Sequence, residues 1–319
     1  MRRREHYNDS ALIFNLKKMD ISVIIPIYNK AEYVELCLES VLEQDVESFE
    51  VIAVDDGSTD ESGAICDDMA HRYPNLRVLH VENGGVTAAR RIGLEHAEGK
   101  YVTFVDADDI MKPQGLSDLL AAIQTTDADE VVATYDTQYG KHVKTGIVGN
   151  VNPDWMIRKL LSASARFCVL WGVVFRREWL EGCLDTPRVV RSGEDILMQI
   201  LYLLKRPKVV FIPDSVYIYT DGLPNQRFMT LEEQQTYDEV LRNAIGERWE
   251  EFADNYTLRR IKMYENFIDC RMFDVLSPYY DDLRTALTKN IPLADRIAVM
   301  LPPMLAYIPI HLRKLLYRK

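Results

Sequence analysis

The first hundred residues alternate between short apolar runs and segments with helical spacing. The continuous apolar runs, typical of strands covered on both faces of a sheet, lie at residues 21–27, 49–54, 76–81 and 101–105. Between them, apolar side chains recur every three to four residues, as in residues 34–42. Strand and helix alternate four times within about 90 residues, which predicts an α/β fold built on a doubly wound, mostly parallel sheet.

The middle of the chain is more mixed. Helices are predicted over residues 86–97, 114–124, 155–161 and 196–204. Strands are predicted at residues 130–135, 167–175, 209–212 and 216–219. Residues 136–150 are polar and indicate a hairpin or flap. Ser58 and Glu61 predict a capping box for the helix that buries Ile65 and Met69.

The composition divides the chain into three parts. Residues 1–18 precede the first strand, and we expect a disordered or loosely docked extension there. Residues 19–226 hold the α/β pattern and form one predicted domain. Glycine and β-branched residues thin out afterwards, so residues 227–319 are predicted to be helical.

The charge and the cysteines exclude several classes of protein. The net charge is −11, which argues against a nucleic-acid partner because such proteins carry a basic footprint. The five cysteines are scattered and form no CxxC pair, so neither a zinc site nor a disulfide framework is indicated. This cysteine usage favours a reduced, cytoplasmic compartment.

The end of the chain has an amphipathic pattern. Residues 311–319 predict a short basic helix, suited to a membrane surface or to a partner protein. A helix packed on the domain with solvated cations explains the pattern equally well. Prolines interrupt residues 297–319, so no spanning helix is predicted there, and any contact with the inner face of the plasma membrane would be peripheral. The helical region is also a candidate surface for a homodimer.

Polar residues, most of them acidic, follow three of the predicted strands: Tyr28 and Asn29, Asp55 and Asp56, and Asp106, Asp108 and Asp109. In an open α/β sheet the carboxyl ends of the strands border the ligand crevice, so these side chains should meet there. Carboxylate oxygens suit Mn²⁺ or Mg²⁺, ions that are commonly shared with substrate phosphates. Aspartates at strand ends also start turns, and the Asp-x-Asp segment alone does not separate the two interpretations.

Two further pieces of chemistry follow from single residues. The carboxylate of Asp56 can accept a hydrogen bond from the imide N–H of uracil, and Tyr28 can stack on a base. Glu194 and Asp195 stand at the start of a predicted helix, where carboxylates are stabilised by the helix dipole. The alternative role for Asp195 is that of a general base that removes a proton from an attacking hydroxyl.

Four segments, in this order, resemble the N-terminal half of a family 2 glycosyltransferase: VIIPIYN, VDDGSTD, GGVTAARRIGLEHAEGKY and FVDADD. The resemblance is strong over residues 20–110 and continues more weakly, through WGVVFRREWLE and SGEDILMQ, to about residue 226. It implies the GT-A fold, a Rossmann-like mixed sheet flanked by helices, with a helical C-terminal extension here.

The resemblance also assigns roles to residues. Asp56 would hold the base, Asp106 would lie near the ribose and the metal, and Asp108 would ligate Mn²⁺ or Mg²⁺. Asp195, with Glu194 beside it, would supply the catalytic base of an inverting transfer. The nucleotide-binding set would be Pro26, Tyr28, Asn29, Asp55, Asp56, Arg90, Asp106 and Asp108. The side chains expected to contact the donor sugar or the acceptor are Trp171 and Arg191.

The family's processive members carry a Gln-x-x-Arg-Trp motif and several membrane helices, and this sequence has neither. We therefore expect an enzyme that transfers one sugar from a nucleotide-sugar donor, a UDP-sugar by preference, to a hydroxyl of a saccharide or lipid-linked acceptor. The expected setting is the synthesis of cell-surface polysaccharide. The rival from another class is a non-catalytic, nucleotide-sugar-binding scaffold. A dehydrogenase is disfavoured because the turn at residues 27–30 contains no glycine.

Overall fold

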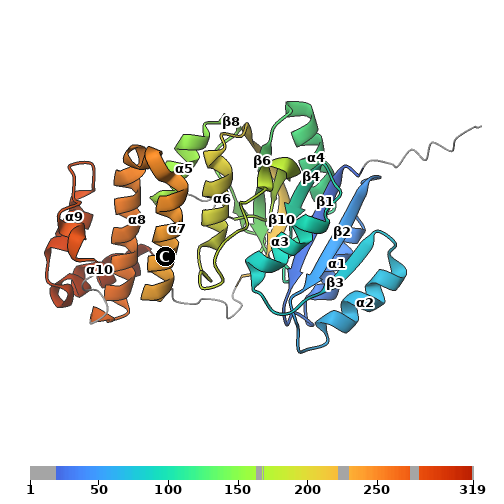
Figure 1. Ribbon diagram of the computed structural model, residues 1–319, viewed down its shortest axis with the longest axis horizontal. Coiled ribbons are helices and arrows are strands. Elements are labelled where there is room, and N and C mark those ends of the chain that lie inside the picture. Colours follow the sequence, from blue (N-terminus) through green and yellow to red (C-terminus); the bar gives the residue numbers. More distant parts are fainter. Residues whose placement is uncertain (1–18, 163–166, 168, 222–229, 274–279, 318–319) are drawn as a thin grey trace, which may run out of the picture.

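The computed structural model describes residues 19–162, 167, 169–221, 230–273 and 280–317. The extension predicted for residues 1–18 lies outside this range. The described chain forms a central sheet covered by helices, with further helices at one end (Figure 1).

The first half of the sheet is parallel, as the continuous apolar runs predict. Its strands, in spatial order, are β3 (Leu76–His80), β2 (Phe49–Asp55), β1 (Ile21–Ile27) and β4 (Tyr101–Phe104). All residues of β2 and β4, and all but one of β1, are buried. The carboxyl ends of these strands point the same way, so the polar residues that follow them reach one edge of the sheet.

The second half of the sheet is mixed. Strand β9 (Val173–Arg176) runs antiparallel to both β4 and β6 (Glu130–Thr137), and β10 (Val209–Tyr219) is parallel to β6. Three short strands pair antiparallel at the border: β5 (Ile110–Met111), β7 (His142–Val143) and β8 (Gly149–Val151). The pairing of β6 with β7 confirms a hairpin at the start of the predicted polar flap.

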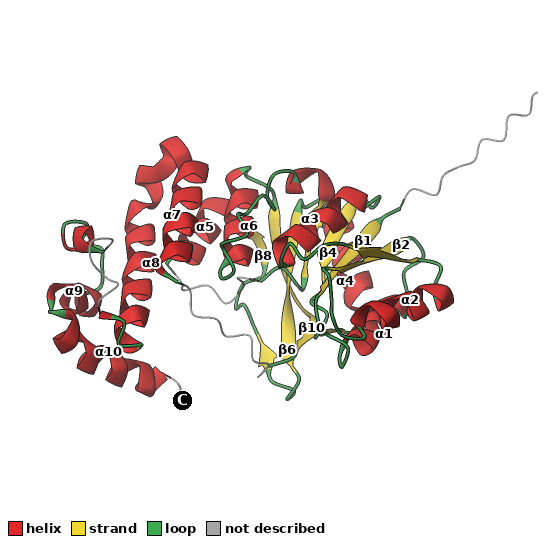
Figure 2. Ribbon diagram, turned by 60° about the horizontal axis from the view of Figure 1, so that its bottom comes forward, coloured by secondary structure: helices red, strands yellow, loops and turns green. Residues whose placement is uncertain are grey.

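Helices cover both faces of the sheet (Figure 2). One face packs against α1 (Val34–Leu42), α2 (Ser62–Arg72) and α4 (Gly115–Thr126). The other face packs against α3 (Val86–His96), α5 (Pro153–Leu161) and α6 (Glu194–Leu204). Because side chains alternate across a strand, Val23 of β1 joins the core of the first face and its neighbour Ile24 joins the core of the second.

The C-terminal region is helical, as predicted. It comprises α7 (Leu231–Ile245), α8 (Trp249–Asp269), α9 (Leu293–Met300) and α10 (Pro303–Tyr317). Single 3₁₀ turns lie in this region at Gly246–Arg248 and Asp281–Arg284. A similar turn at Arg177–Leu180 directly follows β9 in the sheet. Tyr237, Leu241 and Phe252 share the core of α5 and α6, whereas the end of α8 forms a separate core with α9 and α10.

Three local predictions were wrong. The two strands expected at 209–212 and 216–219 are one strand, β10, whose register against β6 shifts between Phe211 and Ser215. The strand expected at 167–175 begins only at Val173, because Gly172 has a φ of 66°, outside the extended region. Residues 163–166 and 168 lie outside the described residues.

The capping box expected at Ser58 and Glu61 is also absent, because α2 begins at Ser62 and its N-cap residue makes no side-chain cap bond. Asp60 accepts hydrogen bonds instead from the backbone N–H and the hydroxyl of Ser62, at 3.0 and 2.5 Å. The Ser58 hydroxyl accepts from the backbone N–H of Asn29 at 3.1 Å. The bond between Asn29 and Ser58 joins the loop after β1 to the loop that precedes α2.

Among the described residues, none of the helices has both the length and the apolar character that crossing a bilayer requires.

Candidate active site

A cavity of about 1010 Å³ opens at the carboxyl ends of β1, β2 and β4. It is bordered by the loops after these strands, by the start of α3 and by the segment that leads into α6. Ten residues singled out from the sequence line it: Pro26, Tyr28, Asn29, Asp56, Arg90, Asp106, Asp108, Arg191, Glu194 and Asp195. Side chains separated by up to 169 positions in the chain therefore share one cavity.

Asp56 is held by the turn that precedes α3. The backbone N–H groups of Gly84 and Gly85 donate to its two carboxylate oxygens at 2.7 and 2.8 Å. Gly85 has a φ of 91°, a conformation that an L side chain rarely adopts, and this lets the turn present both N–H groups. A carboxylate has about four acceptor sites, so Asp56 keeps capacity for a further donor such as an imide N–H.

Arg90 of α3 joins two carboxylates that the sequence separates widely. Its guanidinium donates to Asp106 at 2.8 Å and to Asp195 at 2.7 Å. The Arg90 side chain is only 3% exposed, so this charge is enclosed between the end of β4 and the start of α6. Burial opposes its charge, but Asp195 and Asp106 together raise the pKa of Arg90 above its ordinary value. The bridge therefore holds both carboxylates at fixed positions in the cavity lining.

Burial also affects the carboxylates of this group. It raises the pKa of Asp106, and Asp195 adds to that effect while Arg90 opposes it. The pKa of Glu194 is raised as well, by burial and then by the neighbouring charge of Asp195. Paired carboxylates with raised pKa values in a cavity are a frequent property of catalytic sites.

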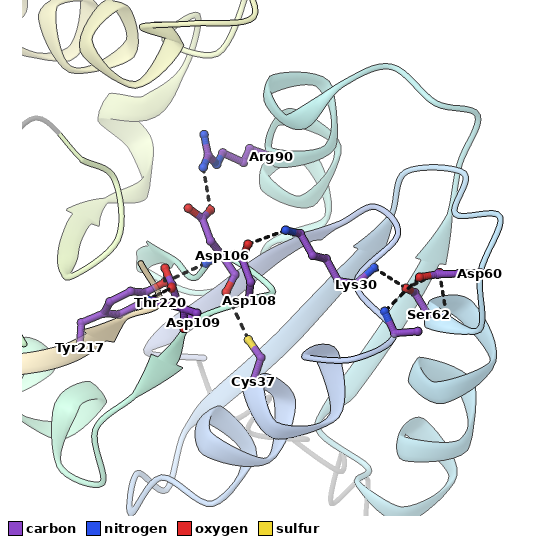
Figure 3. Close-up of polar contacts among 11 residues, drawn as sticks. Lys30, Cys37, Asp60, Ser62, Arg90, Asp106, Asp108, Asp109, Tyr217 and Thr220 are labelled. Carbon is purple, nitrogen blue, oxygen red and sulfur yellow. Dashed lines mark hydrogen bonds and ion pairs between the residues drawn. The ribbon is translucent and has the colours of Figure 1, made fainter. Parts of the chain in front are cut away.

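Asp108 points toward a lysine that the sequence analysis did not assign (Figure 3). The ammonium of Lys30 lies 2.5 Å from the Asp108 carboxylate, and both side chains are largely buried. The backbone N–H of Lys30 donates to Ser62 at 2.7 Å, which orients the loop after β1. The signal in the sequence was a cation three residues beyond a buried strand, beside a predicted acidic cluster.

Asp109 anchors the acidic loop to β10. Its carboxylate accepts from the Tyr217 hydroxyl at 3.0 Å and from the backbone N–H of Thr220 at 2.7 Å (Figure 3). Tyr217 in turn accepts from the backbone N–H of Asp106 at 3.0 Å. Burial raises the pKa of Asp109 to about 8. Asp109 therefore supports the loop, while its neighbours Asp106 and Asp108 line the cavity.

The donor set around Asp108 suits a hard divalent ion that is completed by its substrate. The described residues contain no group of three His, Cys, Asp or Glu side chains able to hold a metal by themselves. Mg²⁺ and Mn²⁺ sites of nucleotide-using enzymes often have only one or two carboxylates, with phosphates and water filling the remaining positions. Asp106 and Asp108, which border the same cavity, would supply these carboxylates, and in the structure their charges are met by Arg90 and Lys30.

Glu194 and Asp195 occupy the first turn of α6. The preceding Gly193 has a φ of 78° and provides no side-chain cap, and the acidic side chains of the first turn are those of Glu194 and Asp195. Asp195 also lines the cavity and contacts Arg90. The position thus combines the structural interpretation, a charge at a helix start, with the access that a general base requires.

Two residues expected at the site do not line the cavity. Asp55 is not among the residues lining the cavity, because its carboxylate is taken by His80 at 2.9 Å and by the backbone N–H of Ser58 at 3.0 Å. Trp171 is 5% exposed and stacks on Tyr217 and Tyr219, so it belongs to the core on the α1 side of the sheet and does not line the cavity.

Asn29 lines the cavity, but its side chain is used locally. Its amide oxygen accepts from the backbone N–H of Thr59 at 2.8 Å, and its φ of 51° lies in the left-handed region. Tyr28 beside it is 46% exposed, which leaves its ring free to stack on a planar ligand. Arg188, for which no role was predicted from the sequence, also lines the cavity. Its guanidinium donates to the side chain of Asn83 at 3.0 Å.

Comparisons with known proteins agree with this geometry. A family model described as "Glycosyl transferase family 2" matches residues 22–184, which contain most of the cavity-lining residues. Glycosyltransferase GlyG of Streptococcus pneumoniae is 35% identical over 218 residues, which are 62% of this chain and 70% of GlyG. Minor teichoic acid biosynthesis protein GgaA of Bacillus subtilis is 29% identical over 208 residues, and the chain spans less than half (46%) of its length.

A solved structure of similar fold is that of TarS 1–349 from S. aureus in complex with UDP. The TM-score is 0.57 at 23% identity, and the alignment covers 88% of this chain and 90% of that one. At this identity the likeness concerns the fold, and it confirms the predicted mixed α/β architecture with C-terminal helices.

Proposed function

This chain is a member of glycosyl transferase family 2 and is therefore a glycosyltransferase, and from that premise we propose its reaction. The donor is a UDP-sugar, and one sugar is transferred with inversion to a hydroxyl of a saccharide or lipid-linked acceptor. The acceptor belongs to the synthesis of a cell-surface polymer. Support for the setting comes from the relative named for teichoic acid biosynthesis, and support for UDP comes from the neighbour solved with UDP.

The single observation that carries the proposal is the bridge from Asp106 through Arg90 to Asp195. It brings the candidate base within one side chain of the acidic loop, and both border the same cavity. An inverting displacement needs these two functions on opposite sides of one reacting carbon, and the bridge holds both at fixed positions.

We propose the following roles for the residues that line the cavity. Tyr28 stacks on the uracil, and Asp56 accepts the hydrogen bond of its imide N–H. Asp108 and Asp106 would hold Mn²⁺ or Mg²⁺, and the ion would supply positive charge that stabilises the departing diphosphate. Asp195 accepts the proton of the acceptor hydroxyl while the new bond forms. Lys30 and Arg191 border the same cavity and supply further positive charge toward the phosphates.

A thermal-shift screen of nucleotide sugars, with and without Mn²⁺, tests the proposal. We expect a selective rise in melting temperature for one UDP-sugar that depends on the metal, because a ligand stabilises only the state that it binds. Calorimetry should then show that Asp108→Ala weakens the metal-dependent binding of UDP. Unchanged UDP binding by this variant would remove Asp108 from the ligand set.

The rival interpretation is a scaffold that binds nucleotide sugars without turning them over. Slow Mn²⁺-dependent hydrolysis of the UDP-sugar by the pure protein separates the two, because a scaffold that only binds releases no free sugar. The geometry favours the enzyme, since Asp195 lines the cavity and binding alone does not require a carboxylate there.

A further inference from the structure

The outer side of α9 and α10 is unusual in its composition. Every exposed residue between positions 292 and 312, all of which are described, is apolar. These are Pro292, Leu293, Ala294, Ile297, Met300, Pro302, Met304, Leu305, Ile308, Pro309 and Leu312. We call this surface the apolar face of α9–α10. Contiguous exposed apolar surface of this kind marks an interaction site on a protein.

The exposures are high and follow the helical period. Met304, Ile308 and Leu312, at four-residue spacing on α10, are 73%, 60% and 56% exposed. Leu293 and Ile297 on α9 are 64% and 48% exposed. The two helices lie at the end of the molecule that is remote from the sheet (Figure 1), so a large surface can approach them without obstruction by the rest of the chain.

The polar side chains of α10 point the other way. Arg313 donates to Asp295 at 2.9 Å, His311 contacts Asp269 at 2.7 Å, and Lys314 contacts Asp269 at 3.2 Å. In the described part of residues 311–319 the cations are thus paired with the domain, and the outward surface of this helix is apolar. These contacts hold the polar side of α10 against α8 and Asp295 of α9 and leave the apolar face outward.

Cations border the apolar face. The exposed Arg271 lies over the ring of Tyr307 in α10, with 5.1 Å to the ring centroid. The exposed Arg284 donates to the carbonyl of Val299 in α9 at 3.4 Å. The segment 292–319 holds five basic residues and one acidic residue in a chain whose net charge is −11. Arg313 and Lys314 are paired with carboxylates of α8 and α9, so the positive charge beside the apolar face comes from residues such as the exposed Arg271 and Arg284.

We propose that the apolar face of α9–α10 binds the surface of an anionic lipid bilayer. Apolar side chains enter the interfacial region while the bordering cations meet anionic headgroups, which is how interfacial helices bind. A second copy of the chain would suit this face less well. A two-fold contact places identical patches together, so the bordering cations of both copies would be brought near one another.

The backbone is consistent with shallow binding. Pro309 lies on the apolar face and lacks an N–H, so the carbonyl of Leu305 cannot receive the usual helical hydrogen bond from residue 309. Such a carbonyl is costly in hydrocarbon but can be hydrated among headgroups. The inference is independent of the proposed reaction, because it uses residues outside the cavity.

The test is flotation of the full chain with vesicles of phosphatidylcholine alone and with an added fraction of phosphatidylglycerol. We expect binding to the anionic vesicles that weakens with salt. Met304→Glu combined with Ile308→Glu should reduce it at least about tenfold, because charged groups replace buried apolar area. Leu293→Glu on α9 is a second, independent variant. Leu36→Glu, at an exposed leucine of α1, is the matched control and should bind normally.

Two outcomes would overturn the proposal. One is absence of vesicle binding by the unaltered chain, or binding that neither variant reduces. The other is a dimer, seen by light scattering without lipid, that Ile308→Glu converts to a monomer, since the face would then be occupied by a second copy. Binding of UDP by calorimetry, expected to be unchanged in every variant, reports correct folding and separates this test from that of the reaction.

Discussion

At the scale of single residues, the cavity is arranged around one buried guanidinium. Arg90 contacts Asp106 and Asp195, which come from the end of β4 and the start of α6. A planar fork with several donors suits two carboxylates better than a lysine ammonium would. Arg90 keeps both acids close to each other in spite of their like charge, and this is why a base and the acidic loop can share one cavity.

The first prediction concerns Asp195. Asp195→Asn should lower the transfer rate by about 10²–10⁴ and leave UDP affinity within a few fold, because a neutral amide cannot accept the proton of the acceptor. Transfer is measured with the donor found in the thermal-shift screen, and UDP affinity by calorimetry. Glu194→Gln is the matched control one residue earlier in the same turn. If Glu194→Gln lost the activity and Asp195→Asn kept it, the two carboxylates would have to exchange roles.

Sequence reasoning reached most of these residues but not their pairing. The carboxylates after buried strands were predictable, since strand ends in such a sheet border one crevice. The contacts of Arg90 and Lys30 were not, because they depend on how α3 and the first loop are placed in three dimensions. The structure places Trp171 outside the lining of the cavity, which the sequence also did not indicate. An aromatic residue in an apolar run is found as often in a core as in a ligand site, and here it stacks on Tyr217.

At the scale of elements, α3 carries Arg90 and must lie close to the sheet. Gly93 makes that approach possible, because a Cβ built there would lie 2.4 Å from Cγ2 of Ile24 in β1. Glycine is therefore needed at position 93 because a side chain would not fit between α3 and β1, and not because of its backbone angles. The close approach of α3 to β1 also sets the position from which Arg90 reaches the carboxylates of Asp106 and Asp195.

The second prediction tests this contact. Alanine normally favours a helix over glycine by about 1 kcal/mol, but Gly93→Ala should instead destabilise the fold by about 1–3 kcal/mol through overpacking. Urea unfolding measures the change. In an Ile24→Ala background the same substitution should cost little, because the clashing methyl group is gone. An equal loss in both backgrounds would contradict the proposed contact.

The third prediction concerns Glu130 at the start of β6. Its side chain is fully buried, and burial raises the pKa of Glu130 to about 8 from an ordinary value of 4.5. A folded-state pKa above the unfolded one means that ionisation opposes folding. The penalty is absent below about pH 4.5, grows as the pH rises and is complete above about pH 8.

Glu130→Gln should therefore stabilise the fold little at pH 5 and by about 2–4 kcal/mol at pH 9. Urea unfolding at the two pH values measures this difference. Glu32→Gln, at an exposed position of the first loop, is the control and should change neither value appreciably. A gain of the same size at pH 5 and pH 9 would show that ionisation of Glu130 is not the cause.

At the scale of the whole molecule, the domain boundary predicted at residue 226 falls where one hydrophobic core includes residues from both sides of it. The change in composition near residue 226 predicted correctly that helices follow, because helical periodicity is a local property. It could not reveal that α7 and the first half of α8 complete the core over α5 and α6. Which helix faces fill which gap is decided by tertiary packing, and only the last helices form a core of their own.

The fourth prediction follows from that difference. A fragment ending at residue 226 should lack a cooperative unfolding transition, because it loses Tyr237, Leu241 and Phe252 from the core beside α5 and α6. Truncating one such aromatic side chain typically costs about 3–5 kcal/mol, a large part of the stability of a domain. A fragment ending at residue 291 keeps these side chains and should retain both a melting transition and UDP binding. Calorimetry on the two fragments makes the comparison, and a well-folded 1–226 fragment would mean that the helices are an independent domain after all.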